Sequence, residues 1–261
     1  MKLILVAAVC GLATGVACAD DAEVSYGGSP SALKGTGTVS MQSEVVVLDI
    51  GPNSVQADCQ FVFKNNGPAC TIRMGFPDGD SAYDENRDNL KAPAESVFSS
   101  FSSFVDGKSA PTTLVRGKDF TWHAKNVSFP ANGIRRVRER YTVPIGGDVG
   151  GTYPLATAYY VLHTGASWRG PIGRMEIIAR FRRSKRAHPT RGNTFQDVVP
   201  LSLRAIGDDG LYHKQWSRPD QEVVVYDGPG TAQAQHNVIR WTRTNIRPTQ
   251  KDDVYLAFKT K

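Results

Sequence analysis

The chain has 261 residues, of which 40% are hydrophobic and 21% are charged, and its formal net charge is +6. This length allows one large β domain or two small ones, with a sizeable core. Beyond the N-terminus no apolar segment is long enough to span a bilayer, so we expect no transmembrane segment in the mature chain.

The N-terminus has the pattern of a secretory signal. One lysine precedes an apolar run, and a small-residue site of the A-x-A kind ends at Ala19. Lipoprotein processing at Cys18 fits less well, because Gly15 stands where a bulky aliphatic residue is expected. We therefore predict a signal peptide over residues 1–19, a mature chain that begins at Asp20, and a secreted or periplasmic location.

Short alternating segments, separated by Gly, Pro and Asn, recur along the rest of the chain. This spacing is typical of an all-β fold, an antiparallel β-sandwich, and no segment shows helical periodicity over eleven or more positions. The predicted strands are residues 39–50, 55–65, 70–76, 99–105, 112–115, 120–129, 134–145, 157–164, 172–181, 198–204, 222–226, 238–245 and 254–258.

Three turns are predicted between these strands. Asn66-Gly67 is typical of a two-residue type I′ hairpin, because both central positions of that turn need φ > 0. The hairpin would pair Phe63 with Cys70 and place most apolar side chains of both strands on one face. Asp106-Gly107 predicts a second hairpin, and Ala131-Asn132-Gly133 a further turn.

Two cysteines, Cys59 and Cys70, remain after the signal is removed. An oxidising compartment favours a disulfide between them. The hairpin register opposes it, since it separates them by roughly 13 Å along the strands, whereas a disulfide needs Cα atoms within about 7 Å. A disulfide and two free thiols both stay open, and both cysteines are predicted to be buried.

A sequence pattern in the first 110 residues combines Gly-Gly, Met-x-Ser-Glu, Phe-x-Asn and Phe-Pro, here at Gly27, Gly28, Met41, Ser43, Glu44, Phe63, Asn65, Phe76 and Pro77. This pattern resembles that of a family of secreted bacterial domains of unknown function. Its later part is also similar to the vault/inter-α-trypsin domain, a β-rich module. The resemblance implies an exported β domain and assigns no activity or site residue.

A Gly-rich stretch over residues 144–154 suggests a division of the mature chain. We predict an N-terminal β-sandwich region over residues 20–147 and a C-terminal β-rich region over residues 148–261. The same stretch would also fit a long loop within one sandwich, so one sandwich or two packed subdomains remain open.

A row of arginines lies in the segment GIRRVRERYTVPI. Because strand side chains alternate, Arg136, Arg138 and Arg140 share one face, about 6.6 Å apart and close enough to repel one another. Such a row binds an anionic partner, or it is an outer sheet face stabilised by cross-strand pairs. Glu139 falls on the opposite, apolar face, where it needs an edge position or a cation partner.

A second basic run, RFRRSKRAHPTR, adds Arg182, Arg183, Lys185 and Arg186 as anion-binding candidates. The two runs favour an anionic glycan or an acidic envelope protein as the partner. Nucleic acid is not expected, because the chain is predicted to be exported and contains no recognisable nucleic-acid-binding module.

No pattern points to catalysis, a metal or a cofactor. The acidic loop that starts at Asp78 lacks calcium-loop spacing, and the five histidines lack metal-ligand spacing. Trp168, in a Gly-rich turn, is the tryptophan predicted to be exposed, whereas a core or turn-anchoring role is favoured over stacking on a sugar ring. We therefore expect a non-catalytic exported protein that binds a partner or an anionic polymer at the cell envelope. The alternative is a carbohydrate-active or other extracytoplasmic hydrolase whose site forms only in the folded chain.

Overall fold

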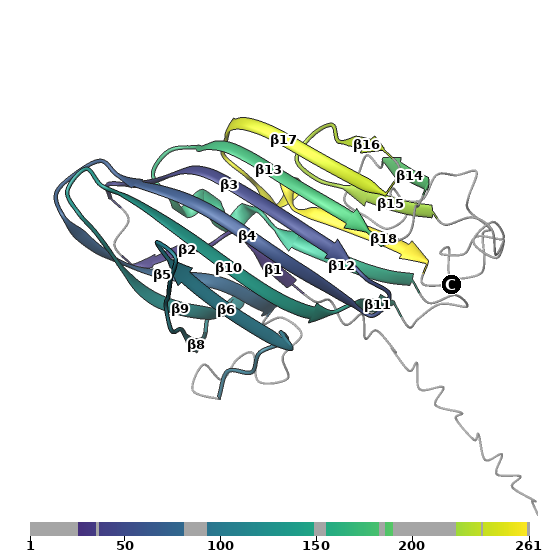
Figure 1. The fold of residues 1–261 in the computed structure, drawn as a ribbon, viewed down its shortest axis with the longest axis horizontal. Helices are drawn as coiled ribbons and strands as arrows, with labels where there is room; N and C mark the ends of the chain where they lie inside the picture. Colours follow the sequence, from purple (N-terminus) through teal and green to yellow (C-terminus); the bar gives the residue numbers. More distant parts are fainter. Residues whose placement is uncertain are drawn as a thin grey trace, which may run out of the picture.

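The computed structural model describes residues 26–34, 37–80, 93–148, 155–182, 186–189, 223–235 and 237–259 (Figure 1). The predicted signal peptide and the predicted strand 198–204 lie outside these residues. Every other predicted strand is present, with ends shifted by at most a few residues.

Eight strands form the largest sheet, and all neighbours are antiparallel except β13 and β3, which are parallel. In order across the sheet they are β16 (Gln233–Gln235), β17 (Val238–Ile246), β13 (Ile172–Phe181), β3 (Val39–Ile50), β4 (Ser54–Asn65), β10 (Ile134–Pro144), β6 (Ser100–Val105) and β7 (Lys108–Ser109).

Two smaller sheets lie against it. The four-stranded sheet consists of β2 (Ser31–Lys34), β5 (Cys70–Asp80), β9 (Phe120–Phe129) and β8 (Thr113–Arg116). The six-stranded sheet consists of β1 (Tyr26–Gly28), β12 (Leu155–Val161), β18 (Val254–Lys259), β15 (Val223–Asp227) and β14 (Arg186–Pro189), with β11 (Gly146–Asp148) also paired to β12. Short 3₁₀ segments are η2 (His163–Ser167) and η5 (Gln250–Asp252).

One face of the eight-stranded sheet forms a single core with both smaller sheets. Against the four-stranded sheet, the rings of Phe76 and Tyr141 lie 5.6 Å apart, and against the six-stranded sheet those of Tyr226 and Trp241 also lie 5.6 Å apart. Strand alternation produces this arrangement, because β3, β4 and β10 bury every second residue over most of their length. The fold is all-β and built from packed, mostly antiparallel sheets, as the sequence predicts.

The predicted hairpin at Asn66-Gly67 is wrong. Strand β4 belongs to the eight-stranded sheet and β5 to the four-stranded sheet, so the chain turns a corner between layers instead of pairing with itself. Neither Asn66 nor Gly67 has a positive φ. The buried Asn65 side chain fixes the corner: its Nδ2 donates to the carbonyl oxygens of Pro68 (2.6 Å) and Pro130 (3.0 Å), and its Oδ1 accepts from the Thr38 hydroxyl (2.6 Å).

The other two predicted turns form. Asp106 and Gly107 have φ values of 50° and 79°, and they join β6 to β7 as a two-residue hairpin. Asn132, with φ of 53°, turns the chain from β9 in one sheet to β10 in another. The Asp106 side chain supports its hairpin further by accepting from the Arg136 backbone N–H at 2.9 Å.

The predicted disulfide candidate is not formed, because Cys59 and Cys70 are free. Once β4 and β5 separate into different sheets, Cys59 is paired with Val46 and Glu139, and Cys70 with Phe129. Cys59 is fully buried as predicted, but Cys70 is only half-buried.

The proposed division at residues 147 and 148 does not separate two sheets. Strands β13 and β17 come from the second region, yet they lie in the eight-stranded sheet beside β3 (Figure 1). The reverse exchange also occurs, since β1 from the first region pairs in parallel with β12 in the six-stranded sheet. The two predicted regions are therefore interleaved.

The residues that carry the family resemblance are mostly core residues. Gly27 lies so close to the Tyr141 ring that a Cβ atom would overlap it, and Gly28 lies equally close to the Val161 carbonyl. Glu44 is buried, whereas Ser43, next to it, is half-buried.

Trp168, predicted to be exposed, is 2% exposed, and its indole N–H donates to the Pro30 carbonyl at 2.7 Å. That prediction was wrong.

Candidate functional site

The predicted arginine row lies on the outer face of the eight-stranded sheet. Arg136 and Arg140 are exposed and Arg138 is half-exposed, whereas Val137, between them, points into the core. Across the sheet Arg140 is opposite Asp58 on β4, and Arg138 is opposite Gln60. The period-two prediction of one shared face is confirmed.

Basic side chains outnumber acidic ones over this face. On strands β17, β13, β3, β4 and β10 the outward positions include seven cations, which are Lys64, Arg136, Arg138, Arg140, Arg174, Arg180 and Arg240, and three anions, which are Asp49, Asp58 and Glu176. Each of the three acids has at least one arginine within 4 Å. The face therefore keeps an excess of positive charge after every acid is counted.

The arginines do not form the mutually repelling row that the sequence suggests. Asp58 accepts from both Nε (2.7 Å) and Nη2 of Arg138, and it also faces Nε of Arg140 at 3.5 Å. The hydrogen bonds from Arg138 lower the pKa of Asp58. Asp58 thus holds Arg138 firmly and Arg140 loosely, so Arg140 keeps donors for another partner.

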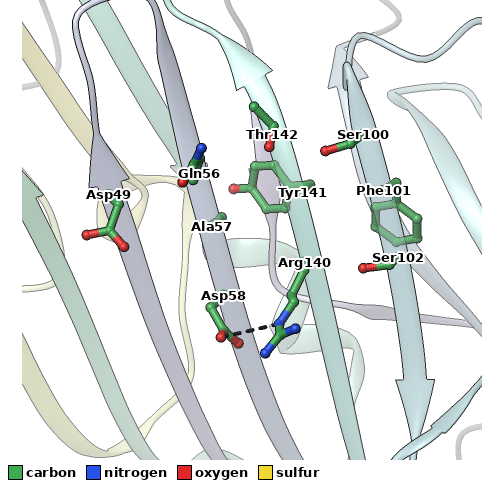
Figure 2. A pocket seen from close by; sticks show the side chains of 10 residues that line it. All are labelled: Asp49, Gln56, Ala57, Asp58, Ser100, Phe101, Ser102, Arg140, Tyr141 and Thr142. Carbon is green, nitrogen blue, oxygen red and sulfur yellow. Dashed lines mark ion pairs between the residues drawn. The ribbon is translucent and has the colours of Figure 1, made fainter.

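A hollow of about 360 Å³ opens on the outer face beside Arg140 (Figure 2). Strands β3, β4, β10 and β6 position its walls, and its polar side chains are those of Asp49, Gln56, Asp58, Ser100, Ser102, Arg140 and Thr142. Small side chains on β6 next to a long arginine on β10 leave this space. Ser100 and Ser102 turn their hydroxyls toward β10, and the Arg140 guanidinium points toward Asp58.

The two carboxylates of the hollow are anchored from outside it. Arg180 on β13 donates twice to Asp49, with both distances 2.7 Å, and Arg138 holds Asp58. Neither Arg180 nor Arg138 lines the hollow. The carboxylates are therefore oriented while part of their hydrogen-bonding capacity still faces the hollow.

The described members of the second basic run, Arg182 and Arg186, do not line this hollow. Arg182 is exposed just past the end of β13, and its backbone N–H donates to the Ile50 carbonyl at 3.2 Å. Arg186 begins β14, which belongs to the six-stranded sheet, and Arg183 and Lys185 lie outside the described residues. Of the candidates that the structure describes, only Arg140 lines the hollow.

Titratable groups also gather inside the sandwich. Glu44 accepts from Ser29 Oγ at 2.5 Å and from Tyr160 Oη at 2.7 Å, and burial raises its pKa to about 7. Glu139 is fully buried and pairs with Lys125, so the cation partner that its position required is present. Burial raises the pKa of Glu139, and Lys125 acts in the opposite direction.

A further internal pair is formed by Asp78 and His123, whose Oδ2 and Nε2 atoms lie 2.8 Å apart. Asp78, the first acid of the predicted acidic loop, is therefore a core residue, whereas Asp84 lies outside the described residues. Phe101 stacks on His123 with ring centroids 3.7 Å apart.

Burial raises the pKa of the Cys59 thiol well above its usual range, which suppresses thiolate chemistry. These groups are enclosed and hold the layers together.

Among the described residues no three His, Cys, Asp or Glu side chains are grouped in a way that would hold a metal ion. None of the helical segments in the described part of the chain is long and apolar enough to cross a membrane.

Sequence reasoning identified Arg140 but missed the rest of the hollow. Ser100, Ser102, Gln56 and Thr142 are common surface residues, and no spacing in the chain marks them. Only the register links them, since Thr142 is paired with Gln56 on one side and with Ser100 on the other.

Comparisons with known proteins establish a fold and no family. No protein-family model and no curated protein matches the sequence. Among solved structures, one from Legionella pneumophila, described as a "putative nutrient binding protein", has a TM-score of 0.60 at 16% identity over 92% of this chain and 73% of that chain. At this identity the similarity shows the fold alone.

Other similar structures are more distant. Yeast LTA4 hydrolase has a TM-score of 0.41 at 8% identity, with 84% of this chain aligned to 28% of that one. An M1 zinc metallopeptidase from Deinococcus radiodurans has a TM-score of 0.38 at 9% identity, with 85% and 42% covered. These similarities carry no argument about activity.

Proposed function

We propose that this is an exported, non-catalytic binding protein that engages an anionic polymer of the cell envelope through the outer face of the eight-stranded sheet, around Arg140. The observation that carries the proposal is the loosely paired guanidinium of Arg140, whose side chain is 49% exposed, at the edge of a polar hollow on a face with excess positive charge. The predicted signal peptide supports a location outside the cytoplasm. The name of the Legionella pneumophila protein with a similar fold is compatible with a binding role.

The chemistry of the hollow favours binding over hydrolysis. A glycosidase needs one carboxyl group that stays protonated near neutral pH as a general acid. Asp58 is unsuited to that role, because the hydrogen bonds from Arg138 lower its pKa. The buried carboxyls whose pKa is raised, Glu44 and Glu139, lie on the opposite face of the sheet, inside the sandwich.

The test compares two substitutions that remove the same charge from the same face. In Arg140→Gln the hollow loses its guanidinium, whereas Arg174→Gln changes an arginine on β13 that is paired with Glu176 and lies away from the hollow. Both variants and the mature wild-type chain are eluted with a salt gradient from a resin that carries polygalacturonate, a carboxylated glycan without sulfate groups. Both variants lose the same general attraction to the polymer, which salt screens. We expect Arg140→Gln to elute at clearly lower salt than Arg174→Gln, because it also loses a specific contact with the polymer. Equal elution of the two variants would show that the face contributes only net charge and would overturn the proposal.

A further inference from the structure

The donors and acceptors of the hollow identify a class of ligand, and this step rests on the proposed function. The hollow presents one loosely held guanidinium, two anchored carboxylates, three hydroxyls and one amide. The guanidinium matches a single carboxylate or similar anion. The carboxylates match hydroxyl donors, and they repel a second negative charge placed near them.

We infer that the hollow binds an acidic saccharide unit of the uronate type, with one carboxylate on Arg140 and ring hydroxyls on Asp49, Asp58 and the hydroxyls of β6. A densely sulfated or phosphorylated ligand is disfavoured at the same place. Asp58 on β4 is the direct cross-strand partner of Arg140, and Asp49 lies one strand further on β3, where it is paired with Gln56. A group with two or three negative charges on Arg140 would lie beside the Asp58 carboxylate, and Asp49 adds a second negative charge to the same hollow.

The size of the hollow agrees with a small ligand portion. Ligand pockets span about 300–1,000 Å³, and about 360 Å³ lies at the low end of this range. The outer face continues along β4 and β10, with Gln60 and Arg138 in the next row. A longer chain of such units can therefore extend past the hollow along the sheet.

The experiment measures binding of two probes by isothermal titration calorimetry: an oligogalacturonate, and inorganic phosphate as the compact multivalent anion. The variants are Asp49→Asn, which removes an acceptor without touching Arg140, and the double variant Ser100→Ala with Ser102→Ala, which leaves net charge unchanged. Near-ultraviolet circular dichroism confirms that each variant is folded.

We expect Asp49→Asn to weaken oligogalacturonate binding while it strengthens phosphate binding. The double serine variant should weaken oligogalacturonate binding roughly two- to fivefold per lost hydrogen bond and leave phosphate binding unchanged. If Asp49→Asn strengthens binding of both probes, the hollow binds anions according to their charge alone. The saccharide assignment is then wrong, while the proposed function stands. If Arg140→Gln changes binding of neither probe, the proposed function itself fails.

Discussion

Glu44 shows at the scale of a single residue how burial controls ionisation. The side chain is fully buried, and the hydroxyls of Ser29 and Tyr160 donate to one of its oxygens. Its other oxygen is also buried and accepts no hydrogen bond in the structure. Charge on Glu44 is therefore poorly compensated, which is why its pKa is raised from 4.5 to about 7.

This shift predicts a pH-dependent stability. Between about pH 4.5 and pH 7, Glu44 keeps its proton in the folded chain but loses it in the unfolded chain. The stabilisation that the protonated Glu44 contributes is therefore complete below about pH 4.5, and it is lost as the pH rises through about 7. The free energy of unfolding should fall by about 3 kcal/mol over this range through Glu44. Glu44→Gln keeps the acceptor oxygen and cannot ionise, so its urea-unfolding free energy should depend less on pH. Equal slopes for variant and wild type between pH 4.5 and pH 8 would contradict this origin.

The pair of Lys125 and Glu139 predicts a second effect of burial. The Lys125 side chain is 3% exposed and Glu139 is 0% exposed. Lys125→Met should lower the free energy of unfolding by about 3–5 kcal/mol, because it leaves a buried carboxylate without its cation. The double variant with Glu139→Leu should recover most of this loss, which chemical denaturation can measure. A double variant as unstable as the single one would show that packing, and not charge, dominates at this site.

At the scale of elements, a corner between sheets replaces the hairpin that the local sequence favours at Asn66-Gly67. Asn65 illustrates the difference, since its amide donates to carbonyls of Gly67, Pro68 and Pro130. Pro130 follows β9 in the chain, so one side chain links two corners. A two-residue hairpin would leave these carbonyls without this donor.

The corner predicts a contrast between two adjacent asparagines. Asn65→Asp replaces the buried amide donor by an acceptor facing carbonyl oxygens, and should cost about 3 kcal/mol of unfolding free energy. Asn66→Asp changes an exposed side chain with the same chemistry and should cost less than about 1 kcal/mol. Thermal and urea denaturation of both variants provide the comparison. Similar losses at the two positions would mean that Asn65 does not fix the corner.

At the scale of the whole molecule, the two halves of the chain complete one another's sheets. β13 pairs with β3 over eight residue pairs, from Arg174 with Ser43 to Phe181 with Ile50. Phe181 and Phe258 continue the core into the six-stranded sheet, with ring centroids 5.4 Å apart. A long-range parallel pairing therefore sits at the centre of the largest sheet.

This interleaving predicts that residues 20–147 do not fold alone. Without residues 148–261, β3 loses its edge partner β13, and the inner face of β3 loses β12, whose Tyr160 donates to Glu44. The fragment should show no cooperative thermal transition by circular dichroism and should bind a hydrophobic dye. A cooperative transition near that of the full mature chain would show that the first region is an independent domain.

The sequence by itself determined the all-β class, twelve of the eighteen described strands, and the outward face of Arg136, Arg138 and Arg140. These properties follow from side-chain alternation and turn chemistry, which act within a few residues. The sequence missed six strands of two to four residues, β1, β2, β7, β11, β14 and β16. Only the tertiary structure decided that β4 and β5 separate, that Cys59 and Cys70 stay unpaired, and that β3 meets β13. The hollow also belongs to this second group, because cross-strand register joins β3, β4, β10 and β6 at one point. Register depends on contacts between distant segments, and no local spacing in the chain encodes them.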